Sequence, residues 1–308
     1  MSNICVLGSV NMDMVYEVED IPKEGETISA KSLNLYPGGK GLNQAIAASR
    51  LGGDVSFIGK VGNDDFGKHL INVLKDEKVH SEYVKYSERE ASGQAVIMID
   101  SNAKNCITVL GGANMSLIKE EIESAVDVIS QSKVMVAQLE IPIEAVISGF
   151  KIAKEKNVLT ILNPAPAKNI PDELYGVTDI IIPNESELEK ISGKPVTTID
   201  EAVQAGKEII NKGVKIVIAT LGDQGAVVIS EKENIHVEGH KVKAVDTTAA
   251  GDSFIGAIAY KLLTHNCIIE ENIRDIVDFS NKAASITVQR KGAQPSLPYL
   301  WEVVNEEV

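Results

Sequence analysis

The chain has 308 residues, of which 44% are hydrophobic, 24% charged and only 4% aromatic, and its formal net charge is -14. This hydrophobic fraction is sufficient for a sizeable core and excludes an intrinsically disordered chain. The lack of clustered basic residues excludes an extended nucleic-acid-binding surface, and no apolar run reaches the roughly 18 residues that a membrane span needs.

The first residues and the cysteines indicate the cellular compartment of the protein. Residues 1–13 lack the basic start and the apolar run of a signal peptide. Cys5, Cys106 and Cys267 are far apart and form no C-x-x-C pair, so we expect three separate small hydrophobic side chains and no disulfide. The five histidines share no metal-ligand spacing and are predicted to be surface or structural residues. We therefore expect a cytoplasmic protein.

Short apolar runs and amphipathic segments alternate along most of the chain. The runs predict strands at 4–8, 55–61, 134–139, 159–162, 180–183 and 215–220. The amphipathic segments predict helices at 43–52, 65–78, 143–156, 184–192, 200–212, 251–263 and 272–288. This alternation is typical of right-handed βαβ units. It predicts an α/β fold with a mostly parallel central sheet and helices on both faces.

Two segments, 13–37 and 93–113, interrupt this alternation. In both, polar and apolar residues alternate around a turn, at 22–25 in the first and 101–105 in the second, which indicates antiparallel hairpins. We interpret them together as a small β-sheet lid, although two ordinary edge hairpins fit the pattern equally well. The remaining ranges, 1–12, 38–92 and 114–308, would then form the α/β core.

The segment from Asp246 to Ala257, DTTAAGDSFIGA, carries the strongest chemical signal. Small residues end a loop there and a helix begins near Gly251, so unpaired amides can hold an anion. Asp252 at this helix start could accept the proton of an attacking hydroxyl. The alternative is that Asp252 is only an acid favoured by the helix dipole.

A glycine-rich turn, YPGGKGLNQAIAA from Tyr36, runs into the first predicted helix. It is not a Walker A loop, because no Ser or Thr follows the lysine at the required spacing. No G-x-G-x-x-G opens the first strand-to-helix turn either, which disfavours a nicotinamide oxidoreductase. Asn11, Asp13, Lys40 and Asn43 are suitable partners for sugar hydroxyls, and the alternative is a solvated polar loop.

Polar residues also follow two later strands. Asn184 and Glu187 share a face of the helix after 180–183, and they could hold Mg²⁺ through water or simply cap the helix. The segment Thr220 to Gly225 ends a strand in a glycine turn, which could contact a nucleotide or be an ordinary tight turn. Ligand sites of parallel sheets form at such strand ends.

Taken in order, these segments resemble the PfkB carbohydrate kinase family over essentially the whole chain. The resemblance rests on the motifs already quoted and on further matching segments, which are VLGSVNMD from Val6, QLE from Gln138, LNPAPA from Leu162 and RKGAQPS from Arg290. It implies ATP-dependent phosphorylation of D-ribose at O5. Kinases for deoxyribose, fructose or adenosine, and a binding protein without catalysis, remain alternatives.

The resemblance also implies residue roles. Asp252 would be the catalytic base, and Ala249, Ala250 and Gly251 the anion hole. The matching sugar-binding positions are Asn11, Asp13, Gly39, Lys40, Gly41, Asn43, Glu140 and Asp252. The matching ATP positions are Asn184, Thr220, Gly222, Gly225, Gly251 and Asn281, and Glu187 would bind Mg²⁺ through water.

A monovalent cation site and a dimer follow from the same resemblance. The positions that match a site for K⁺ are Asp246, Thr248, Thr287, Arg290, Gly292 and Ser296. The lid would also form a homodimer interface. The expected ligands are thus ATP as co-substrate, a small sugar, Mg²⁺ and K⁺, with no nucleic acid and no membrane.

Overall fold

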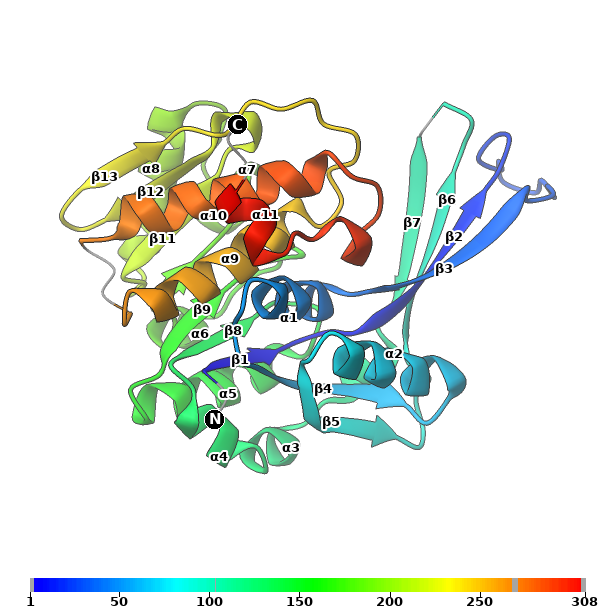
Figure 1. Cartoon of the computed structure of the whole chain (residues 1–308), viewed down its shortest axis with the longest axis horizontal. Helices are drawn as coiled ribbons and strands as arrows, with labels where there is room; N and C mark the ends of the chain where they lie inside the picture. The colour runs from blue at the N-terminus through cyan, green and yellow to red at the C-terminus, as the bar shows by residue number, and fades with distance from the viewer. Residues whose placement is uncertain (1–2, 103, 268–270, 306–308) are drawn as a thin grey trace.

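The computed structural model describes residues 3–102, 104–267 and 271–305, and these form two β-sheets with helices around the larger one (Figure 1). Ala103, which belongs to the predicted turn 101–105, lies outside the described residues. Within the described residues, no helix combines the length and apolarity that a membrane span requires.

The larger sheet has nine strands. In spatial order they are β13 (Asn234–Val237), β12 (Ala226–Ser230), β11 (Ile216–Thr220), β10 (Ile180–Ile181), β9 (Leu159–Leu162), β8 (Val134–Ala137), β1 (Ile4–Leu7), β4 (Val55–Gly62) and β5 (His80–Ser87). The strands from β11 to β5 are all parallel to their neighbours, whereas β12 and β13 add an antiparallel edge. The predicted mostly parallel α/β fold is confirmed.

Helices cover both faces of this sheet. They are α1 (Lys40–Arg50), α2 (Asp65–Asp76), α3 (Lys119–Glu123), α4 (Val126–Gln131), α5 (Ile143–Glu155), α6 (Asp172–Gly176), α7 (Glu185–Ser192), α8 (Ile199–Ile210), α9 (Ala250–Thr264), α10 (Ile273–Val288) and α11 (Leu300–Asn305). Alternate residues of β1 enter different cores. Ile4 and Val6 pack with α1, α2, α9 and α10, and Cys5 and Leu7 pack with α3 to α8. The central strands β1, β4 and β8 bury both faces, which explains their near-continuous apolar runs.

The smaller sheet stands out from the main body in Figure 1 and has the order β3 (Ser32–Gly38), β2 (Asn11–Glu17), β6 (Gly93–Ile99) and β7 (Asn105–Leu110). Each of the two predicted hairpins is antiparallel, but β2 and β6 join them as parallel neighbours. The sheet is therefore mixed, and the antiparallel prediction is corrected at its centre. Pairing between the hairpins depends on residues that are far apart in the sequence, which local patterns do not report.

One other sequence-based expectation needs correction. Cys106 lies exposed on β7, so only Cys5 is a fully buried hydrophobic thiol, while Cys267 is half-buried. The five histidines are not buried, and among them His80, His240 and His265 each lie next to an aspartate.

Arg50, the last residue of α1, ties together three parts of the chain. Its Nε and Nη2 donate to both carboxylate oxygens of Glu77, at 2.9 and 2.6 Å. Its Nη1 donates to the carbonyl oxygens of Gln294 and Leu297, both at 2.8 Å. The Arg50 and Glu77 side chains are only 8% and 13% exposed. A nearly buried, bidentate pair of this kind is costly to break from one side, because the remaining charge keeps its desolvation penalty.

Arg50→Met is expected to lower the free energy of unfolding by about 3–5 kcal/mol, because it leaves the negative charge of Glu77 unbalanced, with the Gln294 amide still donating to it, and removes a donor from two carbonyl groups. Urea denaturation followed by circular dichroism measures this. Lys151→Met is the matched control, since Lys151 and Glu173 form an ion pair with both side chains about half exposed; its cost should stay below about 1 kcal/mol. Equal losses in the two variants would contradict the special role of Arg50.

Candidate active site

Polar side chains gather at the carboxyl edge of the parallel sheet. Gln138 follows β8, Asn163 follows β9, Asn184 follows β10 and Thr220 ends β11. The carboxyl ends of parallel strands meet at one edge, where α/β proteins bind ligands. The sequence order of strands and helices therefore places these groups together, as predicted for Asn184 and Thr220 from their positions after strands.

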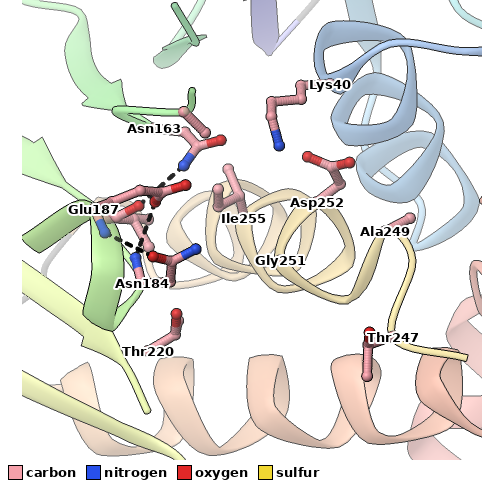
Figure 2. Close-up of a pocket in the computed structure, with 12 residues that line it drawn as sticks. Lys40, Asn163, Asn184, Glu187, Thr220, Thr247, Ala249, Gly251, Asp252 and Ile255 are labelled. Carbon is pink, nitrogen blue, oxygen red and sulfur yellow. Dashed lines mark hydrogen bonds between the residues drawn. The ribbon is translucent and has the colours of Figure 1, made fainter. Parts of the chain in front are cut away.

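A pocket of about 180 Å³ opens at this edge, between the N-termini of α1, α7 and α9 (Figure 2). Its lining residues are Lys40, Asn163, Ala165, Ile182, Asn184, Glu187, Thr220, Thr247, Ala249, Gly251, Asp252 and Ile255. Small-molecule sites usually measure roughly 300–1,000 Å³. The pocket therefore accommodates only part of a nucleotide, and its polar lining suits the phosphate part.

The N-terminus of α9 supplies anion-binding amides to this pocket. Ala249 caps the helix in the left-handed conformation, with φ of 61° and no side-chain cap. Gly251 lies in the first turn, whose amides have no intrahelical partner. A Cβ added at Gly251 would meet no heavy atom within 4 Å. Packing within the protein therefore leaves this position open, and the space beside it is available to a ligand.

Asp252 is buried at the same helix start, and two amide side chains hold its carboxylate. Asn43 Nδ2 donates to Oδ2 at 3.0 Å, and Gln44 Nε2 donates to Oδ1 at 2.9 Å. Burial raises the pKa of Asp252, and the charge of Lys40 opposes this rise. Burial also disfavours the charged form of Lys40, but nearby carboxylates, Asp252 first among them, raise its pKa overall. A basic carboxylate thus faces a lysine across the pocket.

Close packing of α1 against α9 brings these groups into contact. A Cβ at Gly256 would lie 2.5 Å from Ala47 Cβ and 2.9 Å from Gln44 O. Only glycine allows the two helices to approach this closely. One turn nearer the pocket, the same approach places Asn43 and Gln44 against Asp252. The small-residue helix after the glycine-rich turn is therefore what positions the carboxylate.

A second acidic group lies where the small sheet meets the main body. Burial, together with Glu140 and Asp252, raises the pKa of Asp13 to about 7. Asp13 lies directly over Gly38, where a Cβ would meet Asp13 Oδ2 at 2.2 Å. Glu140 Oε2 accepts from Ser9 Oγ at 2.5 Å and from Lys40 N at 3.1 Å. Because the negative charges of Asp13, Glu140 and Asp252 repel one another, this place favours hydroxyl donors or a cation as ligands.

The predicted sugar-binding residues that remain are gathered around Asp13 and Asp252. Asn11 Oδ1 accepts from the buried Asn114 Nδ2 at 2.7 Å, and Asn114 in turn holds both backbone groups of Val10. Gly39 caps α1 with φ of 94°, and Gly41 lies within its first turn. Asn114 was not predicted from the sequence, because it lies 103 residues from Asn11 along the chain and no local pattern reports their contact.

Asn184 and Glu187 form a reciprocal cap at the start of α7. Glu187 N donates to Asn184 Oδ1 at 2.8 Å, and Asn184 N donates to Glu187 Oε2 at 3.0 Å (Figure 2). The capping alternative raised by the sequence is thus present. Both residues also line the pocket, and burial raises the pKa of Glu187. One pair therefore fixes the helix start and presents a carboxylate to the ligand.

The predicted nucleotide residues are only partly brought together. Thr220 lines the pocket, and Gly222 begins the short 3₁₀ helix η2 (Gly222–Gln224) that follows it. A Cβ at Gly225 would lie 2.2 Å from Val237 O, so this glycine is required by backbone packing. Asn281 lies outside the pocket lining, and its Nδ2 donates to the carbonyl oxygens of Val237 and Glu238. Its predicted contact with adenine stays a prediction.

The residues of the predicted cation site lie on two loops that meet. Asp246 Oδ1 accepts from Thr248 N and Oγ1, and Asp246 Oδ2 accepts from Gly292 N at 2.9 Å. Burial alone would raise the pKa of Asp246, but these hydrogen bonds lower it overall. Val288 O accepts from the backbone N–H groups of both Val245 and Asp246.

The other members of that set are mostly engaged within the protein. Ser296 is fully buried and donates to Ala293 O at 2.6 Å. Thr287, also buried, donates to Ala283 O and pairs with Ser253 Oγ at 2.8 Å. Arg290 pairs with Glu302. The predicted K⁺ site stays a prediction.

Known proteins match this chain from end to end. The model for the pfkB family of carbohydrate kinases matches residues 1–300. The ribokinase of Staphylococcus aureus is 42% identical over 303 residues, which cover 98% of each chain. The deoxyribokinase of Salmonella typhi is 35% identical over 305 residues, covering 99% of this chain and 98% of that protein. The structure of Arabidopsis thaliana ribokinase complexed with ribose and ATP has a TM-score of 0.92 at 35% identity, covering 99% of this chain and 98% of that one.

Proposed function

This chain belongs to the pfkB family of carbohydrate kinases, and we propose that it transfers the γ-phosphoryl group of ATP to O5 of D-ribose. One observation carries the proposal: a buried carboxylate, Asp252, lies at an open helix N-terminus and shares a pocket with Lys40. A base and an anion-binding site side by side are what phosphoryl transfer to a hydroxyl requires. The ribokinases among its relatives favour ribose, and the deoxyribokinase makes 2-deoxyribose the second candidate.

In the proposed reaction, the acidic residues that bind the sugar and the acidic residue that acts as the base have different tasks. Asp13 and Glu140, with Asn11 and Asn43, hold the sugar hydroxyls next to Asp252. Asp252 accepts the proton of the 5-hydroxyl as its oxygen bonds to the γ-phosphorus and the bond to the leaving ADP oxygen breaks. Burial raises the pKa of Asp252, which makes it a stronger base than a solvated carboxylate.

The negative charge that develops on the phosphoryl group would lie next to backbone amides and the Lys40 ammonium group. The amide of Gly251, in the first turn of α9, lies at the pocket without an intrahelical partner, and Lys40 reaches the pocket from α1 (Figure 2). The amide of Ala250 donates to Thr247 O at 3.3 Å and so holds the loop before the helix. Thr247 and Ala249 complete the loop around this position. Donors fixed in advance stabilise transition-state charge without reorganising.

Besides Asp252, the described pocket offers Mg²⁺ the carboxylate of Glu187. The described residues contain no group of three or more His, Cys, Asp or Glu side chains suited to a metal. This donor set fits Mg²⁺, which commonly binds one or two carboxylates and takes its other ligands from phosphates and water. Glu187, at the start of α7, would hold Mg²⁺ through water, and the bound ion would neutralise phosphate charge of ATP.

Activation by K⁺ belongs to the same proposal. Asp246 already links the loop before α9 to Gly292 on the loop after α10. A cation held by oxygens of the two loops would stiffen the turn from Asp246 to Ala249 that shapes the anion hole. Asp246, whose pKa is lowered, supplies the charge that such a cation needs.

We also propose that the small sheet acts as a lid over the sugar and as a dimer interface. The core would then comprise 1–12, 38–92 and 114–308. Support comes from the exposed side chains of Leu35, Ile107 and Val109, each about half exposed on this sheet, because such apolar patches mark interaction sites. Sedimentation equilibrium tests the dimer, and a monomer at micromolar concentration would contradict it. A cytoplasmic location fits the three free thiols.

The proposal is tested by ADP production from ATP and Mg²⁺ with a panel of acceptors: D-ribose, 2-deoxy-D-ribose, fructose and adenosine. The highest kcat/KM is expected on ribose, and the rate should fall when tetramethylammonium replaces K⁺. A preference for another acceptor would keep the kinase and change its substrate. Absence of acceptor-dependent turnover would overturn the function, and equal rates in the two salts would overturn the cation site alone.

A further inference from the structure

Behind Asp252 lies a buried chain of side-chain amides that the reaction described above does not use. Gln44, which is 1% exposed, donates through Nε2 to Asp252 Oδ1 at 2.9 Å and to Asn163 Oδ1 at 3.1 Å. Its Oε1 accepts from Gln138 Nε2 at 2.6 Å. Asn163 Nδ2 continues the chain to Ile182 O at 3.2 Å. Gln44 comes from α1, and its partners Gln138, Asn163 and Ile182 come from the ends of β8, β9 and β10.

The direction of every hydrogen bond in this chain is determined by its ends. A carboxylate only accepts, so the NH₂ group of Gln44 must face Asp252, and its oxygen must therefore face Gln138. At the other end, the carbonyl of Ile182 also only accepts, so Asn163 turns its NH₂ toward it and its oxygen toward Gln44. Neither amide can flip without placing two acceptors against each other. Gln44 thus has both of its N–H groups and its oxygen engaged.

We propose that Gln44 is a positioning residue for the base, which rests on the function proposed above. Gln44 donates to Oδ1 while Asn43 donates to Oδ2, and these two hydrogen bonds together fix the plane of the Asp252 carboxylate, which takes the proton of the sugar hydroxyl. The same Nε2 group connects this carboxylate to Asn163, which lines the phosphate side of the pocket. Gln44 therefore sets both the direction and the basicity of the proton acceptor.

The charged groups around Asp252 must be considered together. Lys40 stabilises its charged form, and Glu140 opposes it. Asp13 and Glu187 also experience its charge. None of these groups is replaced in the test, so a change in Asp252 can be attributed to position 44.

The experiment measures the pKa of Asp252 directly, from its ¹³Cγ chemical shift in sugar-free protein labelled at aspartate, with Asp252→Asn identifying the signal. Gln44→Met keeps the side-chain length but removes both donors. The pKa of Asp252 is expected to rise by about one unit or more. The acid limb of the kcat/KM profile should move to higher pH by the same amount, with the dissociation constant of ribose nearly unchanged.

Gln44→Glu provides a second variant, which retains an acceptor for Gln138 and so protects the fold. It places a carboxyl group against Asp252, and the pKa of Asp252 should rise further. Gln138→Met is the matched control, because it removes a buried amide from the same chain without touching Asp252. It is expected to lower stability and leave the acid limb in place.

An unchanged Asp252 pKa in both Gln44 variants would overturn the inference, as would an equal shift in Gln138→Met. A wild-type protein without sugar-dependent turnover would contradict the proposed function instead. The ¹³C titration needs no turnover, so it decides the role of Gln44 in either case.

Discussion

Asp252→Asn is expected to lower kcat by about 10²–10⁴-fold while leaving the dissociation constant of the sugar nearly unchanged. Asparagine has the size of aspartate, and its oxygen can still accept from Gln44 while Asn43 turns its own buried oxygen toward the new NH₂ group. It cannot accept a proton. Burial raises the pKa of the native carboxylate, and Lys40 keeps its charged form accessible. The variant should therefore bind its ligands and fail at the proton transfer. Initial rates and isothermal titration with ribose measure the two effects separately.

Asp200→Asn is the control for this variant. Asp200 is an acid in the first turn of α8, at a helix N-terminus that does not open into the pocket around Asp252. Its replacement should cost stability of about 0.3–1 kcal/mol through the helix dipole and leave kcat unchanged. If Asp252→Asn behaved in the same way, with near-normal kcat, Asp252 would be a helix-terminal acid and not the base.

Asp13→Asn is expected to weaken sugar binding by about 10-fold or more for each hydrogen bond to a sugar hydroxyl that it removes. In the sugar-free protein, the same substitution should raise stability. This second effect follows from the raised pKa of Asp13, about 7 against an ordinary value of 3.8. The stability that this carboxyl contributes is fully present below pH 3.8 and is lost as the pH rises through 7. Asparagine resembles the protonated form, so it avoids the loss.

The gain in stability should thus be near zero at about pH 4, grow between about pH 4 and 7, and level off above about pH 7 at roughly 1–4 kcal/mol. Thermal unfolding of both proteins over this pH range, without sugar, measures it. Saturating ribose should reverse the order at about pH 8, because the native protein gains more binding energy. A pH-independent difference between the two proteins would show that Asp13 is not destabilised by its charge.

Local sequence patterns predicted the central sheet well because its strands are buried on both faces. The apolar run 159–162 has the same bounds as β9, and the segment 184–192 becomes α7 with Asn184 as its cap. The two edge strands β5 and β13, and β12 beside β13, were not predicted. His80–Ser87, with the sequence HSEYVKYS, begins with three polar residues and shows no regular alternation, so its pattern resembles a loop.

The candidate site was predictable only where a motif lies within one segment. Gly251 and Asp252 share a helix start, and Asn184 and Glu187 share another, so spacing alone places each pair. The role of Gln44 depends on Asp252, 208 residues away, and no local pattern reports that contact. Asn281 was predicted to contact adenine, but its amide donates to backbone carbonyls at and after the end of β13 and lies outside the pocket lining. Its position on α10 did not reveal this contact either.

The packing of α1 against α9 also has a consequence for the order in which the protein becomes functional during its synthesis. The hydrogen bond from Asn43 to Asp252 spans 209 residues of chain. At about 5–20 residues per second, a ribosome needs roughly 10–40 seconds to make the intervening segment. Through that interval the N-terminal segment carries the side chains proposed to bind the sugar without Asp252, the proposed base. The nascent chain therefore cannot consume ATP until it is almost complete.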